Sequence, residues 1–111
     1  MHEERRGLRF AFNAGAEIAS KGSSTAFVPA RATELSLRGC FLETSVSFEL
    51  QHIVLLKIHH SEEDFEAEAS VLYVKPSGLG LLFREIEPHC REILQKWILT
   101  ALDSYANASQ I

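Results

Sequence analysis

The chain has 111 residues, of which 46% are hydrophobic and 23% charged, a composition typical of one folded domain with a single modest core. Its formal net charge of −4 argues against a DNA- or RNA-binding protein, because such proteins usually present a basic surface. No apolar run is long enough to span a membrane, and the charged N-terminus is unlike a signal peptide. We therefore expect a cytoplasmic protein with no membrane insertion.

Alternation of apolar and polar residues, the pattern of a half-buried strand, begins near residue 8 and fills the first half of the chain. It covers residues 8–18 and, after a loop of strand-breaking residues at 20–24, returns over residues 26–32 and 34–43. Residues 52–58 are nearly all apolar, as in a strand buried on both faces. The first half of the chain thus predicts four strands.

Two more strands are predicted in the second half. The polar stretch 59–64 predicts a loop, and residues 65–73 alternate again, with Tyr73 on the apolar face. Residues 75–78 combine proline and glycine in a turn, and the alternation resumes over residues 79–86.

The apolar period changes from two to between three and four residues after Pro88, a residue suited to a first helical turn. Residues 88–105 predict an amphipathic helix, and residues 106–111 a frayed tail. We expect its apolar stripe to pack on the strands of this chain rather than on a partner helix. Six short strands followed by one helix predict a mainly β fold, a six-stranded antiparallel β-barrel with a C-terminal amphipathic α-helix.

Catalytic and metal-binding patterns are weak in this sequence. His59 and His60 precede three acidic residues, but neighbours on a strand point to opposite faces and do not converge on a metal. The glycine-rich stretch 78–83 leads into more strand instead of the helix that a phosphate-binding loop requires. We expect no enzyme, no metal and no cofactor. Cys40 and Cys90 are expected to be reduced thiols, with a disulfide between them as the less favoured alternative.

Arginines are concentrated at the N-terminus of this acidic chain. Arg5 and Arg9 are spaced RxxxR, with Arg6 beside the first, and residues 1–9 are expected to be a flexible segment able to wrap a ligand. Guanidinium groups pair in a two-pronged manner with phosphate oxygens or with the O6/N7 edge of guanine. An ordinary charged terminus, with weak ion pairs to nearby glutamates, is the alternative.

The stretch TELSLRGCFLET, residues 33–44, has an unusual polar face if it forms one strand. Glu34 accepts hydrogen bonds from N–H groups, and the Ser36 hydroxyl donates or accepts them. Gly39 lets a flat ligand approach the backbone and also fits a bulge. With the arginines, these residues predict a pocket for a guanine nucleotide.

Taken in chain order, these features resemble the PilZ domain, a family of bacterial receptors for the second messenger cyclic di-GMP. The resemblance rests on RxxxR, an ExSxxG segment about 25 positions later, the late strand GLGLLF and the C-terminal helix. It covers the chain from about residue 4 to residue 102.

The resemblance implies a role for each site residue. Arg5 and Arg9 would clasp the phosphates and guanine edges, with Arg6 as an auxiliary charge. Glu34 and Ser36 would read a guanine base. The chain departs from the family at Glu34, where aspartate or asparagine is usual, and the longer side chain moves the carboxylate outward by about one bond length.

The resemblance also implies a binding module with a single domain, residues 8–105, whose barrel covers about residues 8–86. Segment 1–9 would fold over the bound nucleotide. Such a receptor regulates a partner protein, in control of motility, pili, biofilm or exopolysaccharide. The alternative is a PilZ-type adaptor that has lost the nucleotide and acts by protein contacts, and an enzyme on cyclic dinucleotides is the least favoured reading. The sequence allows a monomer or a homodimer, and one ligand molecule or a stacked pair.

Overall fold

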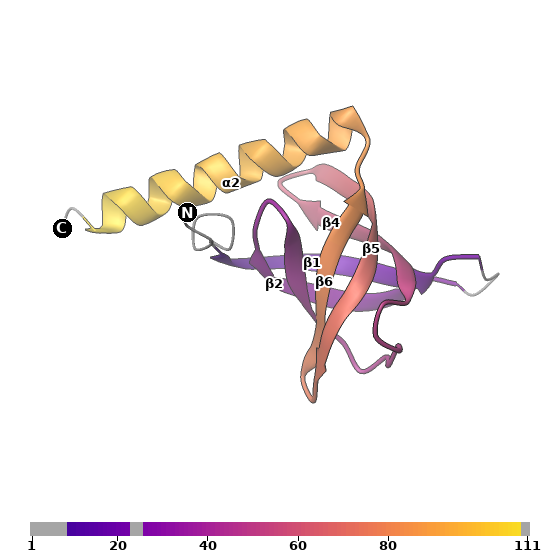
Figure 1. Ribbon diagram of the computed structural model, residues 1–111. Helices are drawn as coiled ribbons and strands as arrows, with labels where there is room; N and C mark the ends of the chain where they lie inside the picture. Colours follow the sequence, from indigo (N-terminus) through magenta and orange to yellow (C-terminus); the bar gives the residue numbers. More distant parts are fainter. Residues whose placement is uncertain (1–8, 23–25, 110–111) are drawn as a thin grey trace, which may run out of the picture.

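The computed structural model describes residues 9–22 and 26–109, with side chains as far as Asp103. It contains the strands β1 (Phe10–Ser20), β2 (Val28–Leu35), β3 (Gly39–Glu43), β4 (Ile53–His60), β5 (Glu63–Lys75) and β6 (Gly78–Glu85), followed by the helix α2 (Pro88–Ser109) (Figure 1). Of the predicted N-terminal segment 1–9, only Arg9 falls within these residues.

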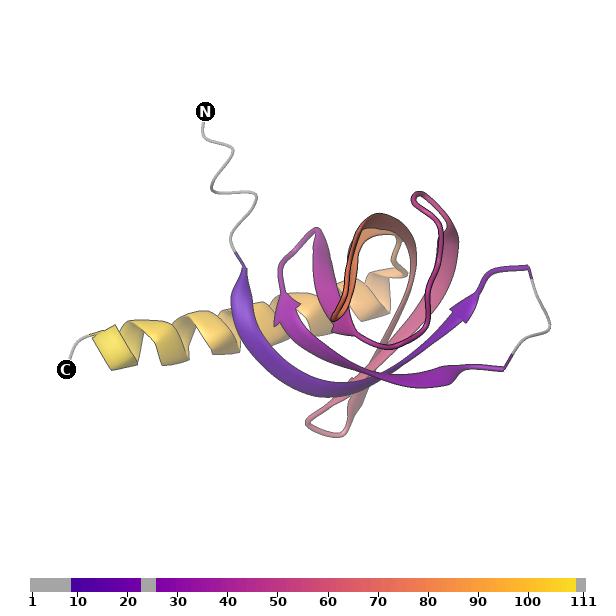
Figure 2. The same cartoon turned by 90° about the horizontal axis from the view of Figure 1, so that it is seen from below.

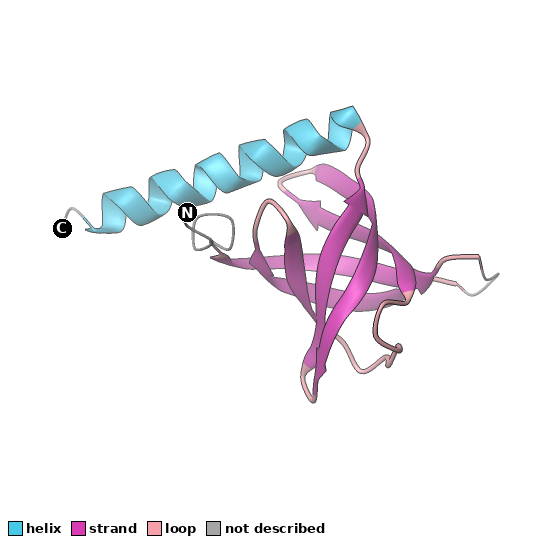
Figure 3. Cartoon of the chain, in the orientation of Figure 1, coloured by secondary structure: helices cyan, strands magenta, loops and turns pink. Residues whose placement is uncertain are grey.

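The six strands form a closed antiparallel barrel in the order β1-β2-β3-β6-β5-β4. β1 closes it, because this long strand pairs with β2 along one side and with β4 along the other. Figure 2 shows β1 and β2, in indigo and purple, curving around the barrel. The predicted six-stranded barrel with one C-terminal helix is confirmed (Figure 3).

Side chains from all six strands fill the barrel, as the alternation predicts. Both cysteines are free thiols and buried, and burial raises the pKa of Cys40 to about 12. The largest fully buried side chains are Phe65, Ile18, Leu35, Leu42, Leu56, Ile58, Leu79, Leu94, Val54 and Val71.

Helix α2 packs against the barrel at β5 and β1. Its anchor is Trp97, which is 4% exposed and lies against the rings of Phe12 and Phe65 at centroid distances of 5.6 and 6.2 Å. The Trp97 indole N–H donates to Glu63 Oε1 at 3.3 Å, and Lys96 Nζ contacts Glu63 Oε2 at 2.6 Å. The apolar stripe is thus used within the chain as far as Ile98, which is 9% exposed.

The C-terminal part of α2 extends past the barrel (Figure 1). The large apolar residues that follow Ile98, Leu99 and Leu102, are exposed. The helix ends at Ser109 rather than near residue 105, because no glycine or proline follows Pro88 to stop it. None of the described helices has the length and apolarity needed to cross a bilayer.

Residues 34–43, predicted as one strand, form the end of β2 and all of β3, with a tight turn between them. Leu35 is 1% exposed and Leu37 is 56% exposed, although the two occupy equivalent places in the alternation. The turn carries neither proline nor an Asn-Gly pair, so the pattern runs through it without a visible break.

The predicted loop at 59–64 is also wrong, because β4 and β5 run through it and meet at a two-residue turn. His59 pairs with Asp64 and His60 with Glu63, while Ser61 and Glu62 take positive φ values of 52° and 64°. Two consecutive left-handed residues are typical of a type I′ hairpin turn, which usually has Asn-Gly. Ser-Glu at these positions gave no such signal.

His59 and His60 serve opposite faces of that hairpin. The His59 ring contacts Asp64 Oδ1 through Nδ1 at 2.7 Å and Glu17 Oε2 through Nε2 at 3.0 Å. The His60 ring contacts the Phe12 ring at a tilt and the Trp97 ring edge-on, with centroid distances of 4.7 and 5.3 Å. The hydrogen bond to Asp64 is the largest effect on His59 and raises its pKa; burial opposes this rise, and the hydrogen bond to Glu17 adds a smaller increase.

We expect His59→Gln to destabilise the protein more at low pH than at high pH. A folded-state pKa above the unfolded value means that the stabilisation is complete below the unfolded pKa, about 6.5, and is lost as pH rises through the folded pKa. The His59 side chain is 39% exposed, so the effect is below about 1 kcal/mol. Urea unfolding at about pH 5.5 and about pH 8.5, with His89→Gln as the control, measures it. An equal loss at both pH values would contradict this prediction.

Candidate functional site

A row of cross-strand partners crosses the outer surface of the barrel. Glu34 on β2 pairs with Phe41 on β3, Phe41 pairs with Gly80 on β6, and Gly80 pairs with Tyr73 on β5. Directly opposed residues project from the same face of a sheet, so these four lie side by side. The Tyr73 ring covers Gly80, where an added Cβ would lie 2.3 Å from the ring. The centroid of the Tyr73 ring is 6.3 Å from the centroid of the Phe41 ring.

Tyr73 reaches the outer surface through a bulge in β5. Val71 pairs with Leu81, but the next pair is Tyr73 with Gly80, so Leu72 is an extra residue without a partner on β6. An extra residue reverses the inward and outward alternation that follows it. The prediction that Tyr73 shares a face with buried Val71 is therefore wrong.

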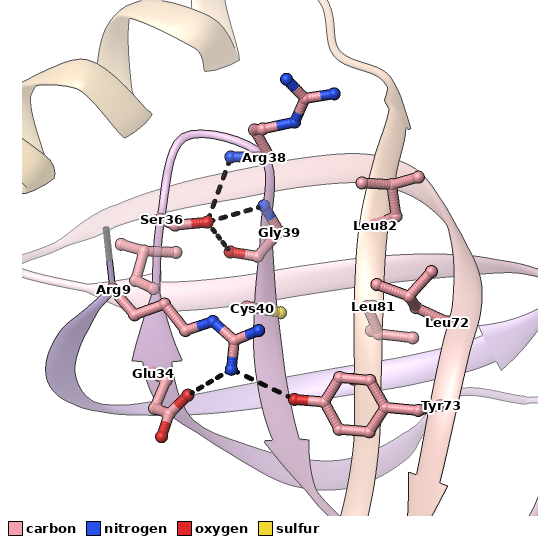
Figure 4. Close-up of a pocket in the computed structure, with 12 residues that line it drawn as sticks. Arg9, Glu34, Ser36, Arg38, Gly39, Cys40, Leu72, Tyr73, Leu81 and Leu82 are labelled. Carbon is pink, nitrogen blue, oxygen red and sulfur yellow. Dashed lines mark hydrogen bonds and ion pairs between the residues drawn. The ribbon is translucent and has the colours of Figure 1, made fainter. Parts of the chain in front are cut away.

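Arg9, just before β1, spans this row (Figure 4). Its Nη1 donates to Glu34 Oε1 and to the Tyr73 hydroxyl, both at 3.3 Å. The hydrogen bond that Arg9 donates to Tyr73, with a smaller contribution from Glu34, raises the pKa of Arg9. The Arg9 and Glu34 side chains are 53% and 46% exposed, so both remain accessible to a ligand.

The turn between β2 and β3 forms the opposite side of the site and is held by Ser36. The Ser36 hydroxyl accepts the backbone N–H groups of Arg38 and Gly39 at 3.2 and 3.1 Å and donates to the Gly39 carbonyl at 3.2 Å. Ser36 is only 7% exposed. Its hydroxyl thus fixes the turn, and contact with a base stays a prediction.

Gly39 is required by the neighbouring strand. A Cβ at this position would lie 2.0 Å from the Leu81 carbonyl oxygen, because β3 and β6 approach closely where Gly39 pairs with Leu82. The sequence offered ligand clearance or a bulge as reasons for this glycine. The structure adds a packing reason that the sequence did not reveal.

A pocket of about 180 Å³ lies between Arg9, Glu34 and Tyr73 on one side and the Ser36–Gly39 turn on the other. Ligand pockets are usually larger, about 300–1,000 Å³, so this one admits part of a nucleotide, with the remainder on the surface. It offers a forked cation, a carboxylate acceptor and an aromatic ring, which are suited to a phosphate and the edge of a base. Arg38 also borders it, with its guanidinium directed away from that of Arg9 (Figure 4).

Of the residues predicted for the site, the structure brings Arg9 and Glu34 into contact and sets Ser36 and Gly39 in the adjoining turn. Arg5 and Arg6 lie outside the described residues. Tyr73 was missed as a site residue. The available signal was the second glycine of Gly-Leu-Gly, since a strand glycine often marks a place covered by an aromatic side chain.

Comparison with solved structures identifies similar folds at low sequence identity. A PilZ domain of CeSA from a cellulose-synthesizing bacterium has a TM-score of 0.69 and 13% identity, covering 84% of this chain and 96% of that one. The PilZ domain of YcgR from Escherichia coli, solved with c-di-GMP, has a TM-score of 0.68 and 14% identity, covering 93% and 95%. Bacillus subtilis MotI/DgrA, named an inhibitor of motility, has a TM-score of 0.70 and 18% identity, covering 90% of this chain and 50% of that one.

Sequence comparison gives the family directly. No curated protein matches the chain. The sequence profile of the PilZ domain, however, matches residues 3–100, which include the RxxxR segment, all six strands and the first half of α2. This match spans most of the chain, and the barrel with its C-terminal helix is the fold of the PilZ domains compared above. The chain belongs to the PilZ domain family.

Proposed function

We propose that this protein is a cyclic di-GMP receptor that binds the nucleotide at the pocket between Arg9 and the Ser36–Gly39 turn. The observation that carries the proposal is the convergence of Arg9 and Glu34 on the outer surface of the barrel, at 3.3 Å. The family supports it, because PilZ domains are regulatory binding domains, and the similar domain of YcgR was solved with this nucleotide.

Replacement of Glu34 by a nucleotide phosphate as the partner of Arg9 favours nucleotide binding. An exposed ion pair such as Arg9–Glu34 contributes about 0–1 kcal/mol, whereas a hydrogen bond between charged groups contributes about 1.5–3 kcal/mol. A nucleotide phosphate can therefore displace Glu34 from Arg9 at a cost of about fivefold in affinity or less. The released carboxylate then faces the N1 and N2 donors of a guanine.

The proposed roles follow from these contacts. Arg9 binds phosphate or a guanine edge, Glu34 accepts from the base, and Ser36 and Gly39 keep the turn in place beside it. Arg5 and Arg6 add positive charge over the part of the ligand that the small pocket leaves outside. The protein would work in the bacterial cytoplasm, where the messenger acts.

Binding regulates a partner protein if the partner distinguishes the ligand-bound surface from the free one. The change proposed here is local: Arg9 leaves Glu34 and Tyr73 for the nucleotide, and segment 1–9 closes over it. The name of MotI, an inhibitor of motility, favours motility among the processes that such a partner could control.

Calorimetric titration of the full chain with cyclic di-GMP at moderate salt tests the proposal. We expect a dissociation constant of about 1 μM or tighter, which corresponds to about −8 kcal/mol. Cyclic di-AMP, which lacks the guanine edge, is the control and should bind at least about tenfold more weakly. The absence of heat from folded protein at high ligand concentration would refute receptor function.

A PilZ-type adaptor without a nucleotide is the second candidate. It is favoured because the polar groups of the site already have hydrogen-bond partners within the protein. Arg9 already contacts Glu34 and Tyr73, and the Ser36 hydroxyl already makes three hydrogen bonds within the turn. Such a site needs no ligand to be stable.

Glu34→Asp separates a receptor from an adaptor. In a receptor, the shorter carboxylate restores the usual family residue and changes affinity by up to about tenfold, in either direction, because it shifts one charged hydrogen bond. In an adaptor, neither protein binds. Parallel calorimetric titrations of the two proteins, with Glu43→Asp as a control outside the pocket, give the answer.

A further inference from the structure

A second, basic groove lies between the β2–β3 turn, the end of β6 and the first turn of α2. It has a volume of about 310 Å³. Arg38 reaches it from the turn, Arg84 from β6 and Arg91 from α2. Phe83 N–H donates to the Arg38 carbonyl at 2.8 Å, which fixes the turn against the end of β6.

The positive charge of this groove is uncompensated within the part of the chain that the structure describes. All three arginines are exposed, and none of the ion pairs between residues 9–22 and 26–103 involves them. No carboxylate lines the groove, although the protein as a whole carries a net charge of −4. Glu85 and Glu87 border a different pocket, beyond Ile86.

Apolar side chains line the groove beside the arginines. Leu37, at the tip of the turn, is 56% exposed, and Phe83 and Ile86 are partly buried against the core. Arginine combined with apolar and aromatic surface is the composition of protein–protein contact sites.

We propose that this arginine groove docks an acidic segment of a partner protein, with carboxylates on Arg38, Arg84 and Arg91 and an apolar side chain against Leu37. A guanine nucleotide fits it poorly, because no side-chain acceptor lines the groove to take the N1 and N2 donors of the base. A peptide supplies the carboxylates and the apolar group together.

The groove adjoins the nucleotide pocket, since Arg38 and Leu82 border both. A partner protein bound in the groove thus contacts the turn that Ser36 holds. It lies beside the nucleotide pocket, where a bound nucleotide can alter its contacts. Docking itself does not depend on nucleotide binding, and Arg84 and Arg91 line only the basic groove among the pockets described here.

The test is an NMR titration of the isotope-labelled full chain with a short synthetic peptide of alternating glutamate and leucine. The same peptide with glutamine in place of glutamate is the probe control. We expect the glutamate peptide to shift backbone amides of residues 37–39 and 82–91, and the shifts to weaken as salt is raised. Arg84→Glu with Arg91→Glu should reduce its affinity by about tenfold or more. Lys57→Glu, a charge reversal outside the groove, should change it by less than about twofold.

If the double variant Arg84→Glu with Arg91→Glu does not fold, the double variant Arg84→Gln with Arg91→Gln takes its place. Either double variant should bind cyclic di-GMP as the wild type does, so failure of the groove and failure of the nucleotide site give different results. Equal shifts by the glutamine peptide, or no shifts at these amides, would overturn the proposal. So would tighter binding of tripolyphosphate or cyclic di-GMP at the same amides, because the groove would then be a small-anion site.

Discussion

Arg9→Ala is expected to weaken cyclic di-GMP binding by about 10- to 100-fold, the equivalent of one lost charged hydrogen-bonding group of about 1.5–3 kcal/mol. The loss has two sources. The phosphate or guanine edge loses its forked donor, and the Glu34 carboxylate, now without its cation, repels the phosphates. Calorimetry of the variant beside the wild type measures the difference.

Arg31→Ala is the matched control for Arg9→Ala. Arg31 is another exposed arginine, on β2, but its guanidinium donates to Asn13 at 2.7 Å and does not border the pocket. Its removal changes net charge equally and should alter affinity by less than about threefold. Both variants should unfold within about 1 kcal/mol of the wild type, because the lost contacts are exposed. If Arg9→Ala bound cyclic di-GMP with wild-type affinity, Arg9 would not be part of the binding site.

Gly39→Ala is expected to destabilise the fold by about 2–3 kcal/mol, since overpacking a close backbone contact forces strands apart. The added Cβ would lie 2.0 Å from the Leu81 carbonyl oxygen, and a carbonyl within a ladder cannot rotate away as a side chain can. The β3–β6 pairing must then separate at Gly39. Urea unfolding of the ligand-free protein shows the effect as a lower midpoint.

Gly15→Ala tests whether the effect at Gly39 comes from this contact. Gly15 also lies in a strand, β1, but apart from its two chain neighbours no described residue has a heavy atom within 4 Å of where its Cβ would be. Alanine there should leave stability unchanged or raise it by up to about 1 kcal/mol, because the unfolded chain loses freedom. If Gly39 served only to let a ligand approach, its alanine variant would keep full stability and lose only binding.

The strands and helix were predictable because each obeys a local rule. Alternation of inward and outward residues predicted five of the strands, the continuous apolar run at 52–58 predicted the other, and the change of period after Pro88 predicted the helix. The interruption after Leu35 was not predictable in this way. It depends on three hydrogen bonds of the Ser36 hydroxyl and on a close approach to β6, and Leu37 continues the apolar alternation through the turn.

Site residues that a sequence motif specifies were predictable. Site residues whose position depends on strand register were not. Arg9 and Glu34 came from the spacing of the motif, and the structure brings them together. Tyr73 depends on the bulge at Leu72, which is fixed by the pairing of β5 with β6, two strands whose register no local pattern encodes. A second glycine opposite the tyrosine is meaningful only once that register is known.

Closure of the barrel limits how any other protein can recognise this domain. Each of the six strands has a hydrogen-bonded neighbour on both sides, so within residues 9–22 and 26–109 no whole strand is left as a free edge on which a partner's strand could be added. We therefore expect recognition to rely mainly on outward side chains, which contribute little to the core. Substitutions among exposed outward side chains usually change stability by little, so the surface that a partner contacts can change while the barrel is retained.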